Sequence, residues 1–320
     1  MAEESQTKMV PDELAGKRLD QALAMMFPEY SRSRLKSWIL QGFVTIDGGE
    51  KRPKDLVSGG ETVALQAANE LGVVSAPEPM ELDIRFEDDE LLVVNKPAGL
   101  VVHPGAGNLR GTLMNGLLHH MAGLAELPRA GIVHRLDKDT SGLLLVGKTL
   151  QSHTALVRML AAREISRKYL AICKGVLTGG GTIDAPIGRH PVDRLRMSVQ
   201  DKGKPAVTRY RVLERFKAHT YISVELESGR THQIRVHFAY RRHPLVGDPV
   251  YGGRMAVPPA SDDTLIETFR KFRRQALHAT CLKFLHPVTT ECVEVEALPP
   301  ADFQKILEVL RGHAIDQGPA

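Results

Sequence analysis

A charged loop set between two apolar runs constrains this chain more than any other feature. Residues 131–142 read Gly-Ile-Val-His-Arg-Leu-Asp-Lys-Asp-Thr-Ser-Gly, and the unbroken apolar run 143–146 follows. Apolar runs of this length are typical of buried strands, so the pattern predicts two strands, at 132–136 and 143–146, joined by a polar loop. Charges held between buried strands are costly unless they pair or react. The loop is therefore the first candidate for chemistry.

The region around this loop is rich in further strand patterns. Strands are predicted from apolar or alternating runs at 91–97, 168–172, 206–213, 220–226 and 292–296. The last three alternate as half-exposed antiparallel strands do. Helical spacing is predicted at 112–120, 152–162, 233–240 and 302–311. The pattern favours an α+β fold around a large mixed, mainly antiparallel sheet.

A smaller unit precedes this region. Helical spacing at 19–27 and 31–40 is followed by a strand at 43–46 and a tight turn, which predicts a small α/β domain. Residues 67–80 lack periodicity and contain two prolines, as linkers do. We therefore expect a frayed terminus at 1–15, the small domain at 16–66, a linker at 67–80, a large domain at 81–313 and a tail at 314–320.

Composition limits the class of protein. No apolar run approaches the ~20 residues of a membrane helix, and the acidic, polar start is unlike a secretory signal, so we expect a cytoplasmic protein without a membrane partner. Three cysteines without metal-ligand spacing indicate reduced thiols. The segment 189–217 holds nine basic and three acidic residues, a net +6 against +4 for the whole chain. This favours a polyanionic partner.

Five motifs, in this order along the chain, resemble those of the pseudouridine synthases that act on large ribosomal RNA. They lie at 95–104, 131–142, 167–171, 228–237 and 244–253. The resemblance implies a pseudouridine synthase catalytic domain in which Asp137 carries the chemistry. It further implies that Arg235 keeps this carboxylate ionised, Tyr169 stacks on the target base, Arg135 fills the space of the flipped nucleotide, and Arg230 contacts RNA.

The small N-terminal unit is similar to the S4 RNA-binding domain. The matching segments are 16–20, 31–36, 42–48 and 54–57. In such domains the second helix lays basic side chains against RNA phosphates, and the resemblance gives this role to Arg32, Arg34 and Lys36. An alternative stays open, because Arg32 and Lys36 are four residues apart and would also solvate an exposed helix face.

Conversion of uridine to pseudouridine breaks the N1–C1′ bond and joins C5 to C1′, without redox change or an added group. We therefore expect no cofactor, and the 13 histidines lack the spacing of a metal site. A carboxylate acts in such a reaction as nucleophile or base. Attack of Asp137 on C1′, attack on C6 and removal of the C2′ proton all stay open. A glycosidase pair of Asp137 and Asp139 is disfavoured, since such carboxylates lie ~5–9.5 Å apart across the scissile bond.

The resemblance implies a function and a partner. A monomeric enzyme would isomerise a flipped-out uridine of 23S ribosomal RNA, or of a large-subunit precursor, in the helix 69 stem-loop. Two alternatives remain: a synthase acting on another ribosomal or transfer RNA site, and a non-catalytic RNA-binding factor in ribosome assembly. The presence of all three of Asp137, Tyr169 and Arg235 favours the enzyme.

Overall fold

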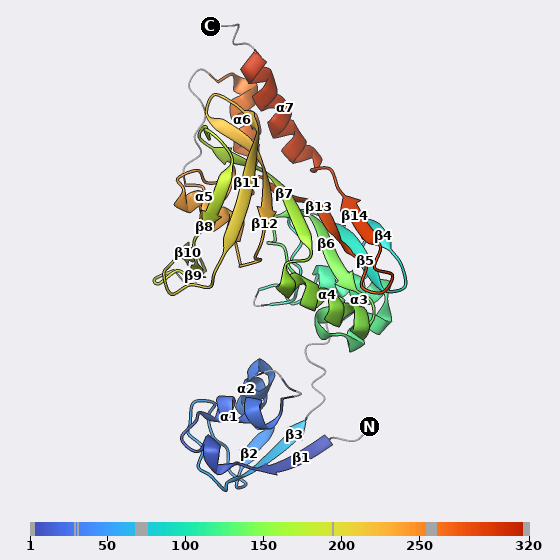
Figure 1. The fold of residues 1–320 in the computed structure, drawn as a ribbon, viewed down its shortest axis with the longest axis vertical. Coiled ribbons are helices and arrows are strands. Elements are labelled where there is room, and N and C mark those ends of the chain that lie inside the picture. Colours follow the sequence, from blue (N-terminus) through green and yellow to red (C-terminus); the bar gives the residue numbers. More distant parts are fainter. Residues whose placement is uncertain are drawn as a thin grey trace. The chain divides into compact units, whose positions relative to one another are not determined.

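The structure is a computed structural model that describes residues 4–28, 30, 32–67, 76–105, 107–193, 195–253 and 261–315. The chain divides into two compact units, Met1–Val74 and Ser75–Ala320 (Figure 1). The division falls within the predicted linker, of which residues 68–75 lie outside the described part. Each unit is described by itself.

The first unit packs two helices on a three-stranded antiparallel sheet of order β1-β3-β2. Its elements are β1 (Glu4–Met9), a 3₁₀ helix (Asp12–Leu14), α1 (Leu19–Met26), α2 (Arg32–Leu40), β2 (Val44–Ile46) and β3 (Thr62–Ala67). Leu23 and Phe27 meet Leu35 and Trp38 in a core from which water is excluded. Both helices and the strand near 43–46 were predicted.

The predicted frayed terminus is wrong for β1. Residues Glu4 to Met9 pair with β3 along their whole length, from Glu4 opposite Ala67 to Met9 opposite Thr62. The strand is polar, Glu-Ser-Gln-Thr-Lys-Met, and lies at the edge of the sheet, so it carries none of the apolar alternation by which a strand is recognised. Backbone hydrogen bonds to β3, and not burial, hold it in place.

The second unit is built on one nine-stranded sheet of order β4-β5-β6-β13-β7-β12-β11-β8, with β14 paired to β13. Among the strands that the structure describes, only β6 and β13 run parallel, which confirms a mixed, mainly antiparallel sheet. The strands are β4 (Ile84–Glu87), β5 (Leu91–Lys96), β6 (Ser141–Gly147), β7 (Ser166–Lys174), β8 (Gly181–Asp184), β11 (Val207–Arg215), β12 (His219–Leu226), β13 (Leu277–Leu285) and β14 (Cys292–Glu296). A separate hairpin joins β9 (Ile187–Arg189) to β10 (Met197–Val199).

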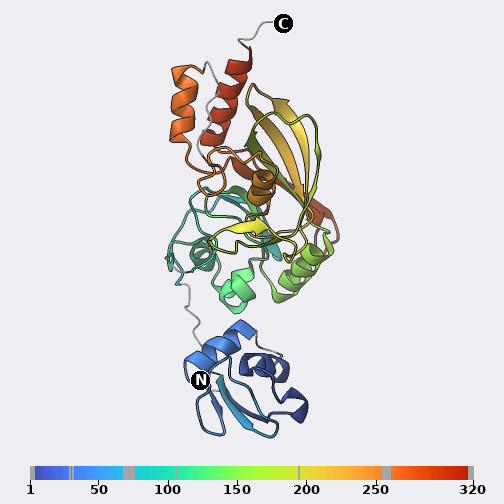
Figure 2. The same ribbon diagram turned by 90° about the vertical axis from the view of Figure 1, so that its left-hand side faces the viewer.

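Helices cover both faces of this sheet. They are α3 (Leu113–His120), α4 (Leu150–Ala162), α5 (Gln233–Tyr240), α6 (Asp263–Lys271) and α7 (Ala301–Ile315), with 3₁₀ turns at Ala122–Glu126 and Pro128–Gly131. On β5, Leu92 and Val94 pack with α3, whereas Leu91 and Val93 pack with α4. Burial on both faces explains why the central strands read as unbroken apolar runs. Figure 2 shows α6 and α7 lying side by side, joined by the contact of Phe269 with the core around Phe303.

The predicted strand at 132–136 does not form. Ile132 makes one isolated bridge to Val146, and the residues after it take no strand partner. The chain enters this segment through Arg129, Ala130 and Gly131, all with positive φ, a conformation that does not belong to a strand. Ile132 is nevertheless 1% exposed, so the apolar run signals burial and not pairing.

Gly142 fixes the end of the loop 137–141 to the sheet. Its φ is +116°, and it lies opposite Ala279 where β6 meets β13. A Cβ atom on Gly142 would lie 2.2 Å from the Ala279 carbonyl oxygen. Glycine is therefore required on two grounds, backbone conformation and close approach of the neighbouring strand.

Replacing Gly142 by Ala tests this constraint. We expect the free energy of unfolding in urea to fall by about 3 kcal/mol or more, because the new methyl group both strains φ and separates β6 from β13. Gly179→Ala is the matched control, since a Cβ there meets no atom within 4 Å. Equal stability of the two variants would contradict the assigned contact.

Candidate active site

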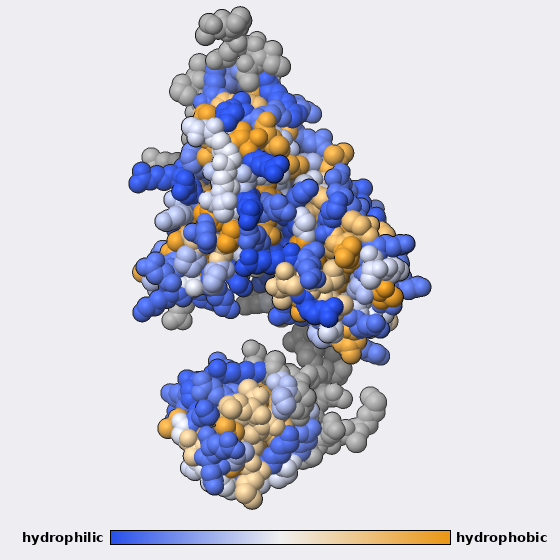
Figure 3. Space-filling model, viewed as in Figure 1, coloured by the Kyte–Doolittle hydropathy of each residue, from blue (hydrophilic) through white to orange (hydrophobic). Residues whose placement is uncertain are grey.

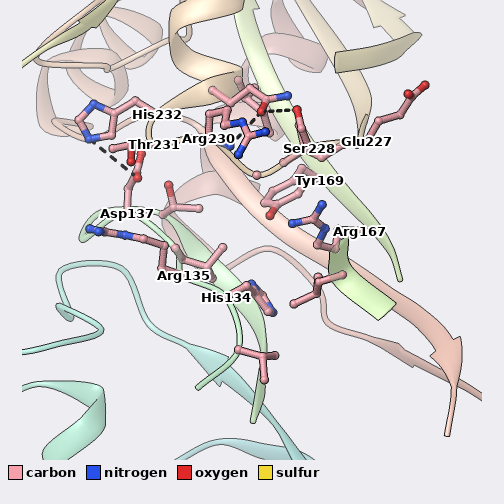
Figure 4. A pocket seen from close by; sticks show the side chains of 18 of the residues that line it. His134, Arg135, Asp137, Arg167, Tyr169, Glu227, Ser228, Arg230, Thr231 and His232 are labelled. Carbon is pink, nitrogen blue, oxygen red and sulfur yellow. Dashed lines mark hydrogen bonds and ion pairs between the residues drawn. The ribbon is translucent and has the colours of Figure 1, made fainter. Parts of the chain in front are cut away.

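A pocket of about 810 Å³ opens on the second unit beside the predicted catalytic loop. It brings together Asp137 and Arg135 from that loop, Tyr169 from β7, Arg230 from the turn after β12, and Arg235 from α5 (Figure 4). These residues come from segments up to about a hundred positions apart, and all five had been singled out from the sequence. In Figure 3, hydrophilic side chains (blue) gather on this unit where β12 ends beside α4.

Asp137 is held by a buried guanidinium. Arg235 is 5% exposed, and its Nη1 donates to Oδ2 of Asp137 over 2.9 Å. Burial alone would lower the pKa of Arg235, but the hydrogen bonds and charges of Asp248 and Asp137 raise it. The guanidinium is therefore a permanent cation, and it forms an ion pair with the Asp137 carboxylate.

Asp248 orients Arg235 from the opposite edge. Arg235 Nε lies 2.8 Å from Asp248 Oδ2 and Nη2 lies 3.0 Å from Oδ1, a bidentate pair. Oδ1 also accepts the backbone N–H groups of Val250 and Tyr251. Burial would raise the pKa of Asp248, but these hydrogen bonds and the charge of Arg235 outweigh it and lower the pKa. Arg235 is thus fixed before any ligand arrives.

A neutral imidazole lies on the other side of Asp137. His232 Nε2 is 3.9 Å from Asp137 Oδ1, and its Nδ1 is 2.9 Å from the Tyr251 hydroxyl, which itself accepts the Met197 N–H. Burial lowers the pKa of His232, with the charge of Asp137 opposing this. His232 therefore adds no second positive charge at neutral pH, and Arg235 remains the cation that balances Asp137.

Comparison with known proteins bears on this site. Residues 90–240 match the family described as RNA pseudouridylate synthase, and residues 17–63 match the S4 domain. The chain is 56% identical to "Ribosomal large subunit pseudouridine synthase D" of Pseudomonas aeruginosa, over 94% of each chain. It is 54% identical to the protein of that name from Xanthomonas campestris, over 95% of this chain and 92% of the relative.

The chain belongs to the pseudouridine synthase family. Two solved human structures have the same fold, named RNA Pseudouridylate Synthase Domain Containing 1 and 4. The first aligns with a TM-score of 0.54 at 28% identity, over 70% of this chain and 86% of its own. The second aligns with a TM-score of 0.56 at 25% identity, over 71% and 92%. The enzyme is an RNA pseudouridine synthase with an S4 domain.

A buried lysine of the synthase holds the backbone of the loop that carries Asp137. Lys96 is fully buried, and its Nζ donates to the carbonyl oxygens of Pro97, Leu100 and Lys138. Burial lowers the pKa of Lys96 to about 7, with the charges of Asp139 and Asp137 opposing this. Three donors are needed for three carbonyls, so the ammonium form suits this position. The backbone next to Asp137 is thereby tied to the end of β5.

A second anchor reaches the loop from the C-terminal part of the chain. Arg274 is bidentate to Asp302 at the start of α7, and its Nη1 lies 3.3 Å from the carbonyl oxygen of Asp139. Gln275 donates to the hydroxyl of Thr140 over 3.0 Å. The loop is therefore clamped between the two ends of the catalytic unit.

The remaining predicted pocket residues differ in exposure. Tyr169 is 5% exposed, and burial raises its pKa, so the phenol is neutral at pH 7. Arg135 and Arg230 are exposed at the rim, where Arg230 Nε donates to the carbonyl oxygen of Pro205. His134 accepts the Leu145 N–H over 3.0 Å, and burial lowers its pKa to about 3.

The basic residues predicted in the S4 domain have separate environments. Lys36 is exposed on α2. Arg32 is half exposed, and its Nη2 lies 2.8 Å from Oδ2 of Asp20, whose side chain is buried. Arg32 thus also neutralises a buried carboxylate, a role that neither reading of the sequence included. The side chain of Arg34 lies outside the described residues.

A possible metal-ligand cluster and the cysteines do not line the pocket. Cys281, Glu294 and Glu296 are the one described cluster with metal-ligand spacing, but it lies on β13 and β14, and Glu294 pairs with Lys283. All three cysteines are free, as predicted. Within the described residues, no helix has the length and apolar character to cross a bilayer.

Lys96, Asp248 and Arg274 had not been singled out from the sequence. Asp248 directly follows the apolar run Leu245–Val246 and Gly247, and a carboxylate in such a setting requires a partner. Lys96 likewise ends a buried apolar strand. A charge at the end of an apolar run was therefore the available signal, although nothing in the spacing identifies the partner.

Replacing Asp248 by Asn tests the anchor of Arg235. Breaking a buried ion pair costs about 3–5 kcal/mol, and Asp137 still partners Arg235, so we expect a loss of about 3 kcal/mol in the free energy of unfolding at pH 7. Asp201→Asn, in an exposed turn, is the control and should change stability by less than about 0.5 kcal/mol.

The pH dependence of this difference follows from the lowered pKa of Asp248. Its ordinary value is 3.8, so the stabilisation is complete above that value and is lost as the pH falls through the lower folded pKa. Urea unfolding should therefore show a constant difference between wild type and Asp248→Asn from pH 7 to pH 5, and a shrinking one below about pH 4. A difference that vanished already at pH 5 would contradict the anchor.

Proposed function

We propose that this synthase converts uridine to pseudouridine in 23S ribosomal RNA, in the helix 69 stem-loop, with Asp137 acting directly on a flipped-out uridine. The main support for a catalytic role of Asp137 is that its carboxylate lines a pocket and lies 2.9 Å from the buried guanidinium of Arg235. The large-subunit substrate is supported by the names of relatives that share more than half of their residues with this chain. The choice of helix 69 follows from the resemblance of the five motifs.

The geometry suits heterolysis of the glycosidic bond. When N1–C1′ breaks, its electron pair stays on the base and the sugar becomes electron-deficient. Asp137 Oδ1 is free of the guanidinium that holds Oδ2, so one oxygen faces the substrate while the other keeps the carboxylate in position. Tyr169 lies on the adjoining wall, where a ring stacks on the turning base. C5 then joins C1′ and releases its proton.

Asp137→Asn should abolish turnover while RNA binding persists. The amide keeps the shape but lacks the charge, so we expect release of tritium from C5-labelled uridine to fall by at least about 10³-fold. Asp139→Asn is the matched control, because its carboxylate does not line the pocket. A rate for Asp137→Asn equal to that of Asp139→Asn would refute the role of Asp137. If the wild type and both variants were all inactive on every RNA tested, the alternative of a non-catalytic RNA-binding factor would be favoured.

The substrate site is tested by mapping pseudouridines in ribosomal RNA from cells without this chain. Loss confined to helix 69, restored by the wild type and not by Asp137→Asn, is the expected result. Loss at another ribosomal or transfer RNA site would keep the reaction and correct the substrate.

The S4 domain is proposed to supply affinity through phosphate contacts. Lys36→Gln removes one exposed charge from α2, and we expect the slope of log affinity against log salt to decrease by about 1, without change in the rate at saturating RNA. Arg32 is unsuitable for this test because it also holds Asp20. Lys305→Gln, on α7, is the charge-matched control. An unchanged slope for Lys36→Gln would count against the contact.

A further inference from the structure

Arg167 is a buried cation without a counterion among the described residues. It is 6% exposed, and its Nε makes no hydrogen bond although water does not reach it. No carboxylate of the described residues forms an ion pair with it, in contrast to Arg235, which has two. A guanidinium buried in this way costs stability unless something outside the chain pairs with it.

The side chain is directed into the pocket. Arg167 and Tyr169 are two apart on β7 and therefore share a face of the sheet, and both line the pocket wall (Figure 4). Gly229 makes room for the guanidinium, since a Cβ there would lie 2.8 Å from Arg167 Nη1. The cation is thus placed beside the aromatic ring and within the space that a ligand enters.

The two carboxylates that line the pocket are engaged elsewhere. Asp137 pairs with Arg235, and Glu227 pairs with Arg163 and Arg209. His134, the neighbour of Arg167, is neutral, because burial and then the charge of Arg167 lower its pKa to about 3. The pocket therefore retains an unbalanced positive charge at Arg167, which suits an electron-rich or anionic group of the substrate.

We propose that Arg167 donates hydrogen bonds to a carbonyl oxygen of the uracil base and stabilises the negative charge that this base acquires when the glycosidic bond breaks. In that step the N1–C1′ electron pair passes to the base and spreads over N1 and the carbonyl oxygens. Asp137 acts on the sugar, and the charge on the base is neutralised when C5 bonds the electron-deficient C1′. The C5 proton is then lost and N1 gains a proton, which gives neutral pseudouridine. This inference rests on the proposed function.

Burial favours the base over a phosphate as the partner of Arg167. The exposed arginines Arg129, Arg135 and Arg230 line the same pocket, and their exposure suits phosphates, which keep their contact with water. Arg167 is buried beside Tyr169, the side chain proposed to stack on the flipped base. Donors in a dry site act most strongly on charge that develops during reaction.

The test compares Arg167→Gln with wild type on a prefolded stem-loop RNA. Removing a donor aimed at developing charge should lower the single-turnover rate constant at saturating enzyme by about 100-fold. Since the interaction strengthens only as the bond breaks, the Kd and its salt slope should change by less than about twofold. Arg167→Lys, which keeps the charge but not the planar fork, should recover part of the lost rate.

Lys168→Gln is the matched control, because it removes the same charge from the next residue of β7, on the exposed face. It should leave the rate constant unchanged. Thermal unfolding separates function from folding: Arg167→Gln should melt at the same or a higher temperature than wild type, because it removes a buried unpaired charge. A lower melting temperature with an unchanged rate constant would show a structural role and overturn the proposal.

The remaining outcomes are distinct. Weaker binding with a shallower salt slope and a normal rate at saturation would show that Arg167 holds a phosphate, which overturns the proposal. An active wild type with an equally active Arg167→Gln overturns this inference alone. A wild type that makes no pseudouridine in any ribosomal RNA fragment overturns the proposed function together with it.

Discussion

The pairing of one guanidinium with two carboxylates is the interaction on which the rest of the site depends. Arg235 is nearly without exposure, so it cannot rely on water to stabilise its charge, and Asp248 supplies the compensation permanently. Asp137 therefore receives a fixed hydrogen bond from a cation already satisfied by another residue. This arrangement leaves the second Asp137 oxygen unengaged by Arg235, so that one oxygen fixes the position of the carboxylate while the other stays clear of the guanidinium.

The loop that carries Asp137 is positioned by polar contacts and not by strand pairing. Lys96 binds its backbone from β5, and Arg274 and Gln275 bind it from the segment before β13. The anchors come from two distant parts of the chain and all are buried, so exclusion of water strengthens their hydrogen bonds. The rigid loop and the fixed Arg235 together account for a site that is organised in the absence of RNA.

The sequence predicted what depends on local pattern. Strands buried on both faces, such as β5 and β6, appear as continuous apolar runs, and the helix at 233–240 was placed with the bounds that the structure shows. The prediction of a strand at 132–136 was wrong because Ile132 and Leu136 are buried without being part of a strand. A buried segment without strand pairing has the same apolar sequence pattern as a buried strand. The polar edge strand β1 was missed for the opposite reason, because a strand that pairs without being buried has no apolar pattern in its sequence.

The residues of the pocket were predicted through the resemblance, whereas their supports were not. Asp137 and Arg235 lie about a hundred positions apart, and no spacing rule links a loop to a distant helix. The resemblance links the two residues because both belong to motifs of one family, found in the same order along the chain. Asp248, Lys96 and Arg274 act through tertiary contacts to backbone or to Arg235, and those contacts exist only once the sheet has assembled. Arg167 was inside a quoted motif, but its lack of a partner is visible only in three dimensions.

The central position of β13 has a consequence for synthesis of the chain. This strand, Leu277–Leu285, lies between β6 and β7, so the middle of the sheet is supplied by a segment that is translated about 100 residues after β7 ends. Until it emerges, β6 and β7 have unpaired edges facing one another, and the loop lacks Arg274 and Gln275. Contacts between such distant segments form slowly and late. A nascent chain whose S4 domain is complete therefore still lacks the contacts that position the Asp137 loop.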